Sequence, residues 1–334
     1  MKVELIAPED PAWGEILRAS ADATAFHHPS WSAVLSDTYG YPAHVLAWRD
    51  GARMLGGVPV LRVGKRLVAL PFTDHCPPVY ADRADGARFV ADLLRWQKTS
   101  ETRLEVRSSL AHDAGQANVV GTRHVLDLAV GADALFSRLH RTRKKRINTA
   151  REIGIEVTLS RSVDELPAFY RLHCETRRRQ GIPVQPRRFI EHLWRNVIVP
   201  GHGFVITARM SGEPVATALF MSWNRRLIYK YGASDRARWD LGANFLVHWT
   251  AIERACAGGF TSYDLGRTDL GQDGLRAFKA GWGAEEFPLV YTHLGAQAPR
   301  LERGLAGAAV AQIIKHSPTV VCRALGELLY RYAA

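Results

Sequence analysis

The stretch LIYKYGASDRARWDLGANFLVHWTAIERACAGGFTSYDLG, residues 227–266, decides the fold. Its pattern predicts a strand over 226–233, a charged loop, a helix over 242–257 and a second strand over 262–265. The passage therefore forms one strand–loop–helix–strand unit of an α/β protein.

Strands and helices also alternate ahead of this unit. The sequence predicts a strand at 155–159, helices at 163–179 and 187–198, and strands at 203–210 and 214–222. Hairpin turns are expected at Ser211-Gly212 and Asn224-Arg225. The second half thus has the order β-α-α-β-β-β-α-β, which indicates an α/β fold with mixed sheets.

The first half holds shorter elements. After the loop TAFHHPSW (24–31) and a short helix, the segments 44–51 and 52–72 are typical of β-hairpins. A helix at 85–98 and strands at 102–107 and 123–128 follow.

The chain length indicates two lobes, because 334 residues is about twice the size of a common domain. We assign 1–131 to a first lobe and 154–297 to a second. A basic connecting helix, 132–153, lies between them, and a helical tail, 298–334, follows.

Composition restricts the class of protein. With 47% hydrophobic and 23% charged residues, the chain is typical of an ordered globular protein. The formal charge of +11 favours polyanionic partners, whether nucleic acid, nucleotide-linked substrates or an anionic membrane face. The charge alone does not choose among them.

The four cysteines are scattered without the spacing of a zinc site or a disulfide framework. We expect no metal and no tightly bound cofactor. The N-terminus lacks an apolar signal segment, and no apolar run reaches the roughly 18 residues that would cross a bilayer. These observations predict a cytoplasmic protein.

Four passages resemble the FemAB family, in which two GNAT-like lobes are fused: FHHPSW (26–31), LHRTRKKRINTAREIGIEV (139–157), YKYGASD (229–235) and GLRAFKAGWG (274–283). With the strands between them they span nearly the whole chain to about residue 295. GNAT enzymes usually carry Gln/Arg-x-x-Gly-x-Gly/Ala before the helix that starts here at 242. This chain keeps only Arg238-Trp-Asp-Leu-Gly242-Ala243, one residue out of step, which favours the FemAB branch.

The resemblance implies a transferase that moves an aminoacyl group from aminoacyl-tRNA to an amine of a peptide-like, nucleotide-linked or cell-envelope acceptor. It also implies that Lys279 lies by the acceptor and donor groups, and that Tyr229 and Tyr231 line the acceptor channel. One alternative is a GNAT-type N-acyltransferase that uses acyl-CoA. A second is a non-catalytic module of the same fold that binds RNA or another polyanion.

Acyl transfer of this kind needs a poised amine, help for the oxyanion and a route for a proton. Lys279, next to Phe278, could neutralise a carboxylate or the oxyanion, or could be a solvated surface lysine. Tyr229 and Tyr231 are two residues apart, so a regular strand would point both to one face and Lys230 to the other. They could pack in the core or line a groove.

Acidic residues supply further candidates. Asp264 and Arg267 close the predicted strand at 262–265, where either ligand contact or turn capping is expected. Asp74 and His75 lie in the first-lobe loop PFTDHCPP, whose prolines suggest a rigid turn toward the interlobe cleft. We predict Lys279, Asp74 and Asp264 as catalytic. The predicted substrate-binding residues are Tyr229, Tyr231, Phe278, Trp31 and Arg267.

The strongest charge feature is the run of seven Lys/Arg between 138 and 151, which contains no acid. It could be a solvated face, but its density favours phosphate contact. We predict phosphate or tRNA binding at Arg143, Lys144, Lys145, Arg146, Arg177, Gly242 and Ala243. The last two begin the helix at 242–257, where free N–H groups and the helix dipole favour an anion.

The segment 304–334 is expected to form two short helices broken at Ser317-Pro318. They could dock on the protein itself. They could also touch the inner membrane surface, with Lys315, Arg323 and Arg331 toward lipid head groups.

Overall fold

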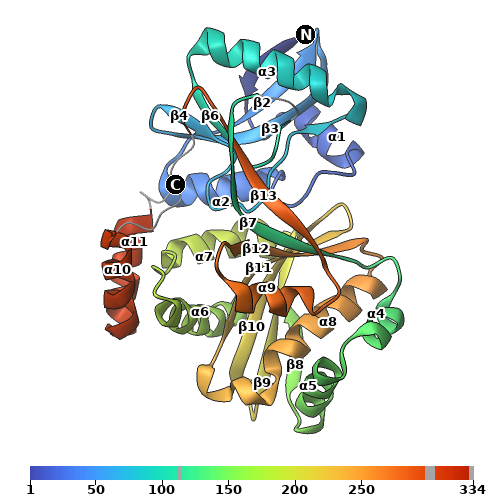
Figure 1. Ribbon diagram of the computed structural model, residues 1–334, viewed down its shortest axis with the longest axis vertical. Helices are drawn as coiled ribbons and strands as arrows, with labels where there is room; N and C mark the ends of the chain where they lie inside the picture. Colours follow the sequence, from blue (N-terminus) through green and yellow to red (C-terminus); the bar gives the residue numbers. More distant parts are fainter. Residues whose placement is uncertain (111–113, 298–304, 331–334) are drawn as a thin grey trace.

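The computed structural model describes residues 1–110, 114–297 and 305–330, and it shows two lobes joined by one continuous sheet (Figure 1). The strands are β1 (Lys2–Ile6), β2 (Ala43–Asp50), β3 (Arg53–Val63), β4 (Arg66–Val68), β5 (Val79–Tyr80), β6 (Arg103–Val106), β7 (Gln116–Asp127), β8 (Glu156–Ser160), β9 (Gly203–Met210), β10 (Glu213–Trp223), β11 (Arg226–Ser234), β12 (Ser262–Asp269) and β13 (Glu285–Leu294). The α-helices are α1 (Pro11–Ala19), α2 (Pro29–Tyr39), α3 (Gly86–Ser100), α4 (Ala132–Arg138), α5 (Arg141–Glu152), α6 (Leu166–Gln180), α7 (Arg187–Leu193), α8 (Ala243–Ala257), α9 (Asp273–Ala280), α10 (Leu305–His316) and α11 (Thr319–Leu329). The short helical turns are η1 (Arg83–Asp85), η2 (Val163–Glu165), η3 (Trp194–Ile198) and η4 (Arg236–Leu241).

The two lobes exchange strands. The sheet order is β1-β2-β3-β4-β6-β13-β7-β12-β11-β10-β9-β8, with β5 paired to β3. Strand β7, from the first lobe's sequence, pairs with β12 of the second, and β13 of the second lobe pairs with β6 of the first. Figure 1 shows β7 and β13 running together from one lobe into the other. Pairing therefore crosses the boundaries assigned from the sequence and ties the lobes together.

The second half has the predicted order, and its hairpin turns lie where expected. Ser211 and Gly212 have φ of 51° and 81°, and Asn224 and Arg225 have φ of 47° and 59°. Two successive residues with positive φ are typical of the two-residue turns that match the twist of paired strands. The sequence did not predict β1, α1, α9 or β13, and β12 extends beyond its predicted end to Asp269.

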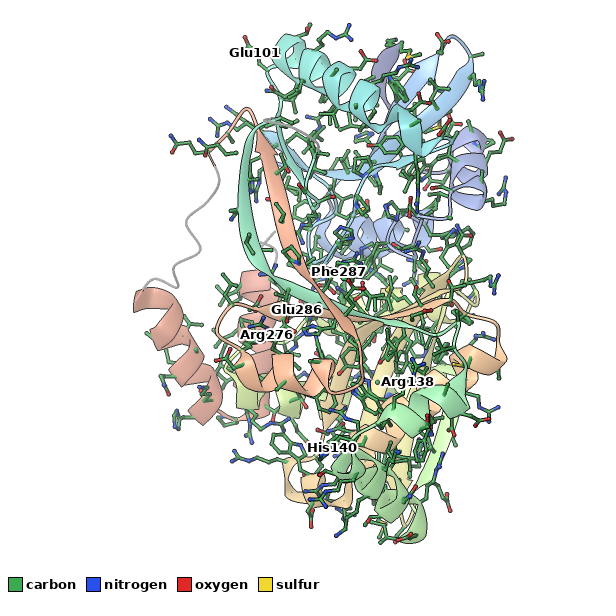
Figure 2. All side chains as sticks on the ribbon, turned by 45° about the vertical axis from the view of Figure 1, so that its right-hand side comes forward. Glu101, Arg138, His140, Arg276, Glu286 and Phe287 are labelled. Carbon is green, nitrogen blue, oxygen red and sulfur yellow. The ribbon has the colours of Figure 1, made fainter. Side chains whose placement is uncertain are left out.

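The predicted single helix over 132–153 is wrong, because it breaks into α4 and α5. Leu139 is extended, with ψ of 141°, and its side chain is buried in the core beneath α8. The His140 side chain then accepts a hydrogen bond from Thr142 N at 3.3 Å, which starts α5 (Figure 2). Burial of Leu139 and this cap explain the break.

Helices cover both faces of the second lobe's sheet. On one face, α6 and α7 share a core with α2 of the first lobe through Trp31, Tyr170 and Phe189. On the other face, α4, α5 and α8 pack together. Arg276 of α9 is bound to Glu286 of β13, with Nε 2.5 Å from Oε2 (Figure 2). The second lobe is thus a sheet with helices on both sides.

The tail forms α10 and α11, with the predicted break at Ser317-Pro318, and both helices dock on α6. Ile314 and Cys322 are fully buried there, whereas Val320 and Leu328 are 68% and 65% exposed. Arg331 lies outside the described residues. Among the helices described, none is long and apolar enough to cross a membrane.

Gly326 of α11 admits the backbone of Val184, since a Cβ there would lie 1.9 Å from the Val184 carbonyl oxygen. We expect Gly326→Ala to lift α11 from α6 at a local cost of roughly 1–3 kcal/mol. Hydrogen exchange of α11 amides should accelerate. Gly14→Ala is the control, because a Cβ there meets only the flexible end of Arg18. Unchanged exchange in Gly326→Ala would contradict this packing.

Candidate functional site

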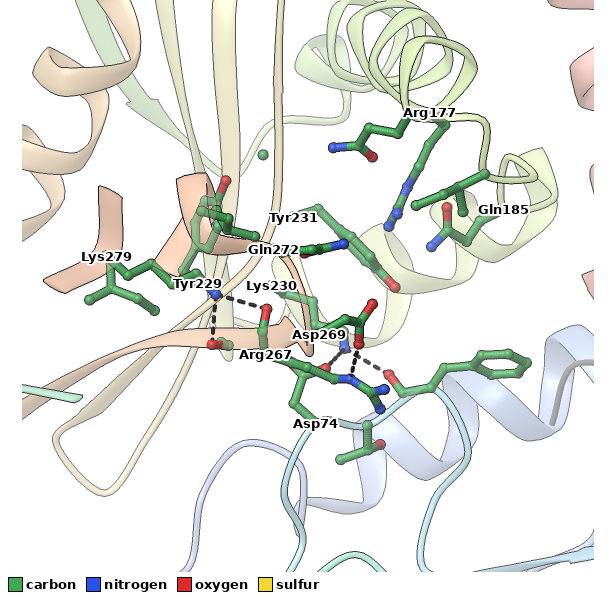
Figure 3. Close-up of a pocket in the computed structure, with 18 of the residues that line it drawn as sticks. Asp74, Arg177, Gln185, Tyr229, Lys230, Tyr231, Arg267, Asp269, Gln272 and Lys279 are labelled. Atoms are coloured by element: carbon green, nitrogen blue, oxygen red, sulfur yellow. Dashed lines mark hydrogen bonds and ion pairs between the residues drawn. The ribbon is translucent and has the colours of Figure 1, made fainter. Parts of the chain in front are cut away.

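A cavity of about 800 Å³ lies between the lobes (Figure 3). Its walls come from the loop 72–74, the end of α6, β11, β12, α9 and Tyr330. Five basic side chains line it, together with three acidic ones: Arg107, Arg177, Lys230, Arg267 and Lys279, with Asp74, Asp269 and Asp273. The surplus of positive charge suits an anionic or carbonyl-bearing substrate.

The cavity exists because β11 and β12 separate. Their parallel pairing covers only Arg226–Ile228 against 262–264, and it stops before Tyr229. At the same level β11 carries a bulge opposite β10, since Tyr229 pairs with Phe220 and Tyr231 with Leu219. Lys230 is the extra residue. The bulge re-aims the side chains next to the opening.

The bulge corrects the prediction that Tyr229 and Tyr231 share a face. Tyr229 packs beside His248 of α8, with ring centroids 4.7 Å apart, whereas Tyr231 packs beside His173 of α6 at 5.4 Å. The two rings therefore lie on opposite faces of β11, although both line the cavity. Burial raises the pKa of Tyr229 to about 12, so its hydroxyl is protonated at neutral pH.

Lys230 is the main residue that sequence reasoning missed. Its side chain is 4% exposed, donates to Phe72 O at 2.7 Å and lies 3.7 Å from Asp74 Oδ1. The ammonium also lies 5.0 Å from the ring centroid of Phe26 and 5.2 Å from that of Trp31. Burial lowers the pKa of Lys230, and the nearby charge of Asp74 offsets only part of this decrease. The sequence gives no sign that Lys230 lies at the cavity, because the bulge that turns its side chain there cannot be recognised from the sequence.

The first-lobe loop that carries Asp74 is strained and firmly held. Leu70 and Phe72 both have φ of 61°, which is costly for residues with a side chain. Arg107 donates to Thr73 O at 2.6 Å, and the Tyr291 hydroxyl donates to Asp74 O at 3.0 Å. With the bond from Lys230, these contacts fix the carboxylate of Asp74 at the cavity wall.

Trp31 supports the same loop and does not line the cavity. Its ring is fully buried, and its Nε1 donates to Thr73 Oγ1 at 2.7 Å. Trp31 thus holds the loop through Thr73 and does not make the substrate contact that the sequence predicts.

Lys279 lines the cavity from α9 and is 3% exposed, so the surface-lysine alternative is wrong. Its Nζ donates to Gly266 O at 2.7 Å and to Arg267 O at 2.8 Å (Figure 3). Burial lowers its pKa to about 8, against the opposing charges of Asp74 and other acids. Lys279 thus secures the β12 wall and has a third proton available.

Of the other predicted residues, Arg267 lines the cavity, whereas Asp264 and Phe278 do not. Asp264 does not line it, and its carboxylate binds Arg123 at 3.1 Å and accepts from Gly266 N at 2.8 Å. Arg267 does line it and is paired with Asp269 at 2.6 Å. Phe278 packs next to His248, away from the lining. Asp264 and Phe278 therefore have structural contacts in place of the predicted direct ones.

Most of the predicted phosphate-binding residues have other partners. Arg143 lies over the ring of Trp282 at 4.3 Å and donates to Phe278 O at 3.0 Å. Lys144 and Arg146 donate to the carbonyl oxygens of Ser137 and Asp240. Lys145 is exposed. None of the four lines the cavity, whereas Arg177 does.

The N-terminus of α8 is covered at Gly242. A Cβ there would lie 2.6 Å from the carbonyl oxygen of Arg146, and Ala243 is 4% exposed. Neither residue lines the cavity. The sequence predicted an open anion site here, but α5 packs its backbone against this turn.

Chemistry at the cavity rests on charge and hydrogen bonding. Its described lining contains neither cysteine nor serine. Nor does the described chain hold three or more His, Cys, Asp or Glu arranged for a metal ion. The lining therefore offers charged and hydrogen-bonding groups to a ligand.

Comparison with known proteins places this geometry in a class. Residues 137–287 match the family model described as an acetyltransferase (GNAT) domain. No curated protein matches the sequence. The second lobe accordingly has the GNAT fold, and the match supports a transferase.

Solved structures extend the similarity to both lobes. FemX is 15% identical with a TM-score of 0.67, covering 87% of this chain and 96% of its own. The C-terminal domain of a putative lysylphosphatidylglycerol synthetase from Agrobacterium fabrum is 14% identical with a TM-score of 0.56, covering 90% of this chain and 97% of its own. A tandem GNAT protein from the clavulanic acid biosynthesis pathway is 11% identical with a TM-score of 0.51, covering 89% and 100%. The chain therefore has the FemAB-like tandem GNAT fold that the sequence predicted.

The pKa of Lys279 gives a test of its charge. If the protonated amine assists turnover, activity should fall as pH rises through about 8, because the amine becomes neutral. Lys279→Met should lower kcat/KM and abolish this alkaline limb. The measurement is the pH profile of acceptor-dependent transfer.

Lys279→Met also leaves two carbonyl oxygens without their donor, so we expect a loss of roughly 1–3 kcal/mol in unfolding free energy. Activity is therefore normalised to the folded fraction, measured by thermal denaturation. If the normalised activity equals that of the wild type and the alkaline limb is retained, Lys279 only stabilises the fold.

Proposed function

We propose that this protein transfers an aminoacyl group from aminoacyl-tRNA to an amine of a peptide-like or cell-envelope acceptor. The observation that carries the proposal is the position of Asp74. The first lobe fixes this carboxylate beside Lys230 at the opening between β11 and β12, where the second lobe has the GNAT fold.

The proposed reaction needs one proton acceptor. The acceptor amine attacks the ester carbonyl carbon of the donor, and a C–N bond forms while the carbonyl oxygen becomes an oxyanion. Asp74 takes the proton from the nitrogen. When the ester C–O bond breaks, the ribose hydroxyl of the tRNA leaves and takes that proton back. Atoms and charge balance without a covalent enzyme intermediate.

The positive residues of the cavity would stabilise the oxyanion. Lys279 holds the β12 backbone and offers its remaining N–H, and Arg267 lies on the same wall. Arg177, at the α6 side, is placed for a phosphate or carboxylate of either substrate. Such groups contribute through preorganised charge in a site partly shielded from water.

The donor class rests on two further observations. Fold similarity to a putative lysylphosphatidylglycerol synthetase from Agrobacterium fabrum favours an aminoacyl group. The contact between Gly242 and Arg146 disfavours a pyrophosphate at the N-terminus of α8. An acyl-CoA donor remains the second candidate, because the family model at 137–287 is that of an acetyltransferase.

A donor screen tests the proposal. Purified protein is offered labelled aminoacyl-tRNA and a panel of acyl-CoA thioesters, each with and without a pool of amine-bearing peptides. Amine-dependent deacylation of tRNA is expected. Selective use of a thioester would move the protein to the acyl-CoA class, and silence with both would favour the non-catalytic polyanion-binding module.

Asp74→Asn tests whether Asp74 accepts the proton of the attacking amine. The amide keeps the size of the side chain but cannot take the proton, so turnover should fall by about 10²-fold or more with KM little changed. Asp273→Asn is the matched control, since Asp273 lines the same cavity but is exposed in the first turn of α9. Steady-state kinetics decides: equal turnover in the two variants would remove Asp74 from the reaction.

A further inference from the structure

A second basic hollow lies outside the cavity, on the other side of the last turn of α6. It has a volume of about 400 Å³. We call it the α6–η4 patch and define it by Arg178, Arg179, Arg236, Trp239 and Lys315. Trp239 stands next to the hollow on η4, and the other four line it.

The charge of this patch is only partly offset by the two acids that line the hollow, Glu175 and Asp235. Its two acids have their own partners: Glu175 binds Arg171 at 3.3 Å, and Asp235 lies 3.8 Å from Arg238. Within residues 1–110, 114–297 and 305–330, no acid forms an ion pair with the four basic members of the patch. Clustered unpaired cations around a hollow favour a bound polyanion.

Trp239 adds a flat aromatic surface. It is 50% exposed, although its Nε1 donates to Ser234 Oγ at 2.9 Å. The guanidinium of Arg179 lies 4.7 Å from its ring centroid and donates to Ser234 O at 3.2 Å. The indole is thus fixed in place with a large part of its surface in solvent. An exposed aromatic ring among cations suits the stacking of a nucleobase beside bound phosphates.

The patch and the cavity lie on two sides of the last turn of α6. Arg177 and Gln180 line the cavity, while Arg178 and Arg179, from the same turn of α6, line the patch. On the opposite side, Arg146 of α5 donates to Asp240 O at the end of η4, so the basic helix adjoins the patch. A strand of RNA could therefore pass from α5 across the patch and place its end in the cavity.

We infer that the α6–η4 patch binds the acceptor end of the donor tRNA, with phosphates on Arg178, Arg236 and Lys315 and a base on Trp239. This inference rests on the proposed function, because it supplies the docking surface of the same donor. RNA is favoured over an anionic membrane because the patch is a hollow with a fixed indole. The exposed apolar side chains Val320 and Leu328 belong to α11, which contributes no residue to it.

The test compares two double variants of equal charge. Arg178→Ala/Arg236→Ala removes two patch cations. Arg53→Ala/Lys65→Ala removes two exposed cations from first-lobe turns. Binding of unfractionated tRNA is measured by filter retention between about 50 and 200 mM salt. The patch variant should bind more weakly, with a salt slope lower by about 2, and the control should match wild type.

Trp239 is tested separately. Trp239→Ala should weaken tRNA binding, and Trp239→Phe should restore most of it, because phenylalanine keeps a stacking face. A structural role for the indole hydrogen bond to Ser234 would instead make the two variants equally weak. That result would overturn stacking at this position.

The remaining outcomes separate the patch from the proposed function. Suppose that the wild-type protein transfers from aminoacyl-tRNA, and that the patch variant has unchanged tRNA affinity and KM. This result would overturn the inference about the patch and leave the proposed function standing. Wild type that neither binds nor uses tRNA would overturn both. A patch variant that keeps tRNA binding but loses sedimentation with phosphatidylglycerol vesicles would assign the surface to a membrane and overturn the RNA inference.

Discussion

The separation of β11 from β12 is the constraint on which the rest of the site depends. Parallel pairing ends after Ile228, and the bulge at Lys230 removes one residue from the register with β10. Without the bulge, Lys230 would alternate regularly with its neighbours, and the two tyrosines would share a face. With it, Tyr229, Lys230 and Tyr231 all reach one cavity from a single strand. The opening also exposes the edge of β12 that Lys279 secures.

The first lobe completes the site through a loop that residues of both lobes hold in place. Three donors, Lys230, Arg107 and Tyr291, bind successive carbonyl oxygens of residues 72–74. Two of the residues at positive φ, Leu70 and Phe72, are kept in place by this network. Because β7 and β13 cross between the lobes, one continuous sheet connects the loop to the cavity walls. The carboxylate of Asp74 and the opposite wall of the cavity are thereby fixed relative to each other.

Much of the fold could be predicted, but less of the site. Hairpins at Ser211-Gly212 and Asn224-Arg225 have local signals, and so does the helix from 243. The cavity positions of Lys279 and Asp74 followed from the resemblance and from a proline-rich turn, whereas that of Arg177 was not predicted. The roles of Lys230, Arg143 and Gly242 did not, because a bulge, an aromatic cage and a helix packed on a glycine are tertiary features.

The most direct measurement is a crystal structure with a 3′-aminoacylamido adenosine, a non-hydrolysable analogue of the donor's end. We expect its carbonyl carbon in the opening between β11 and β12, with Asp74 within hydrogen-bonding reach of the space beside it. An analogue seated instead at the N-terminus of α8, beside Gly242, would contradict the account and support the phosphate-loop mode of an acyl-CoA enzyme.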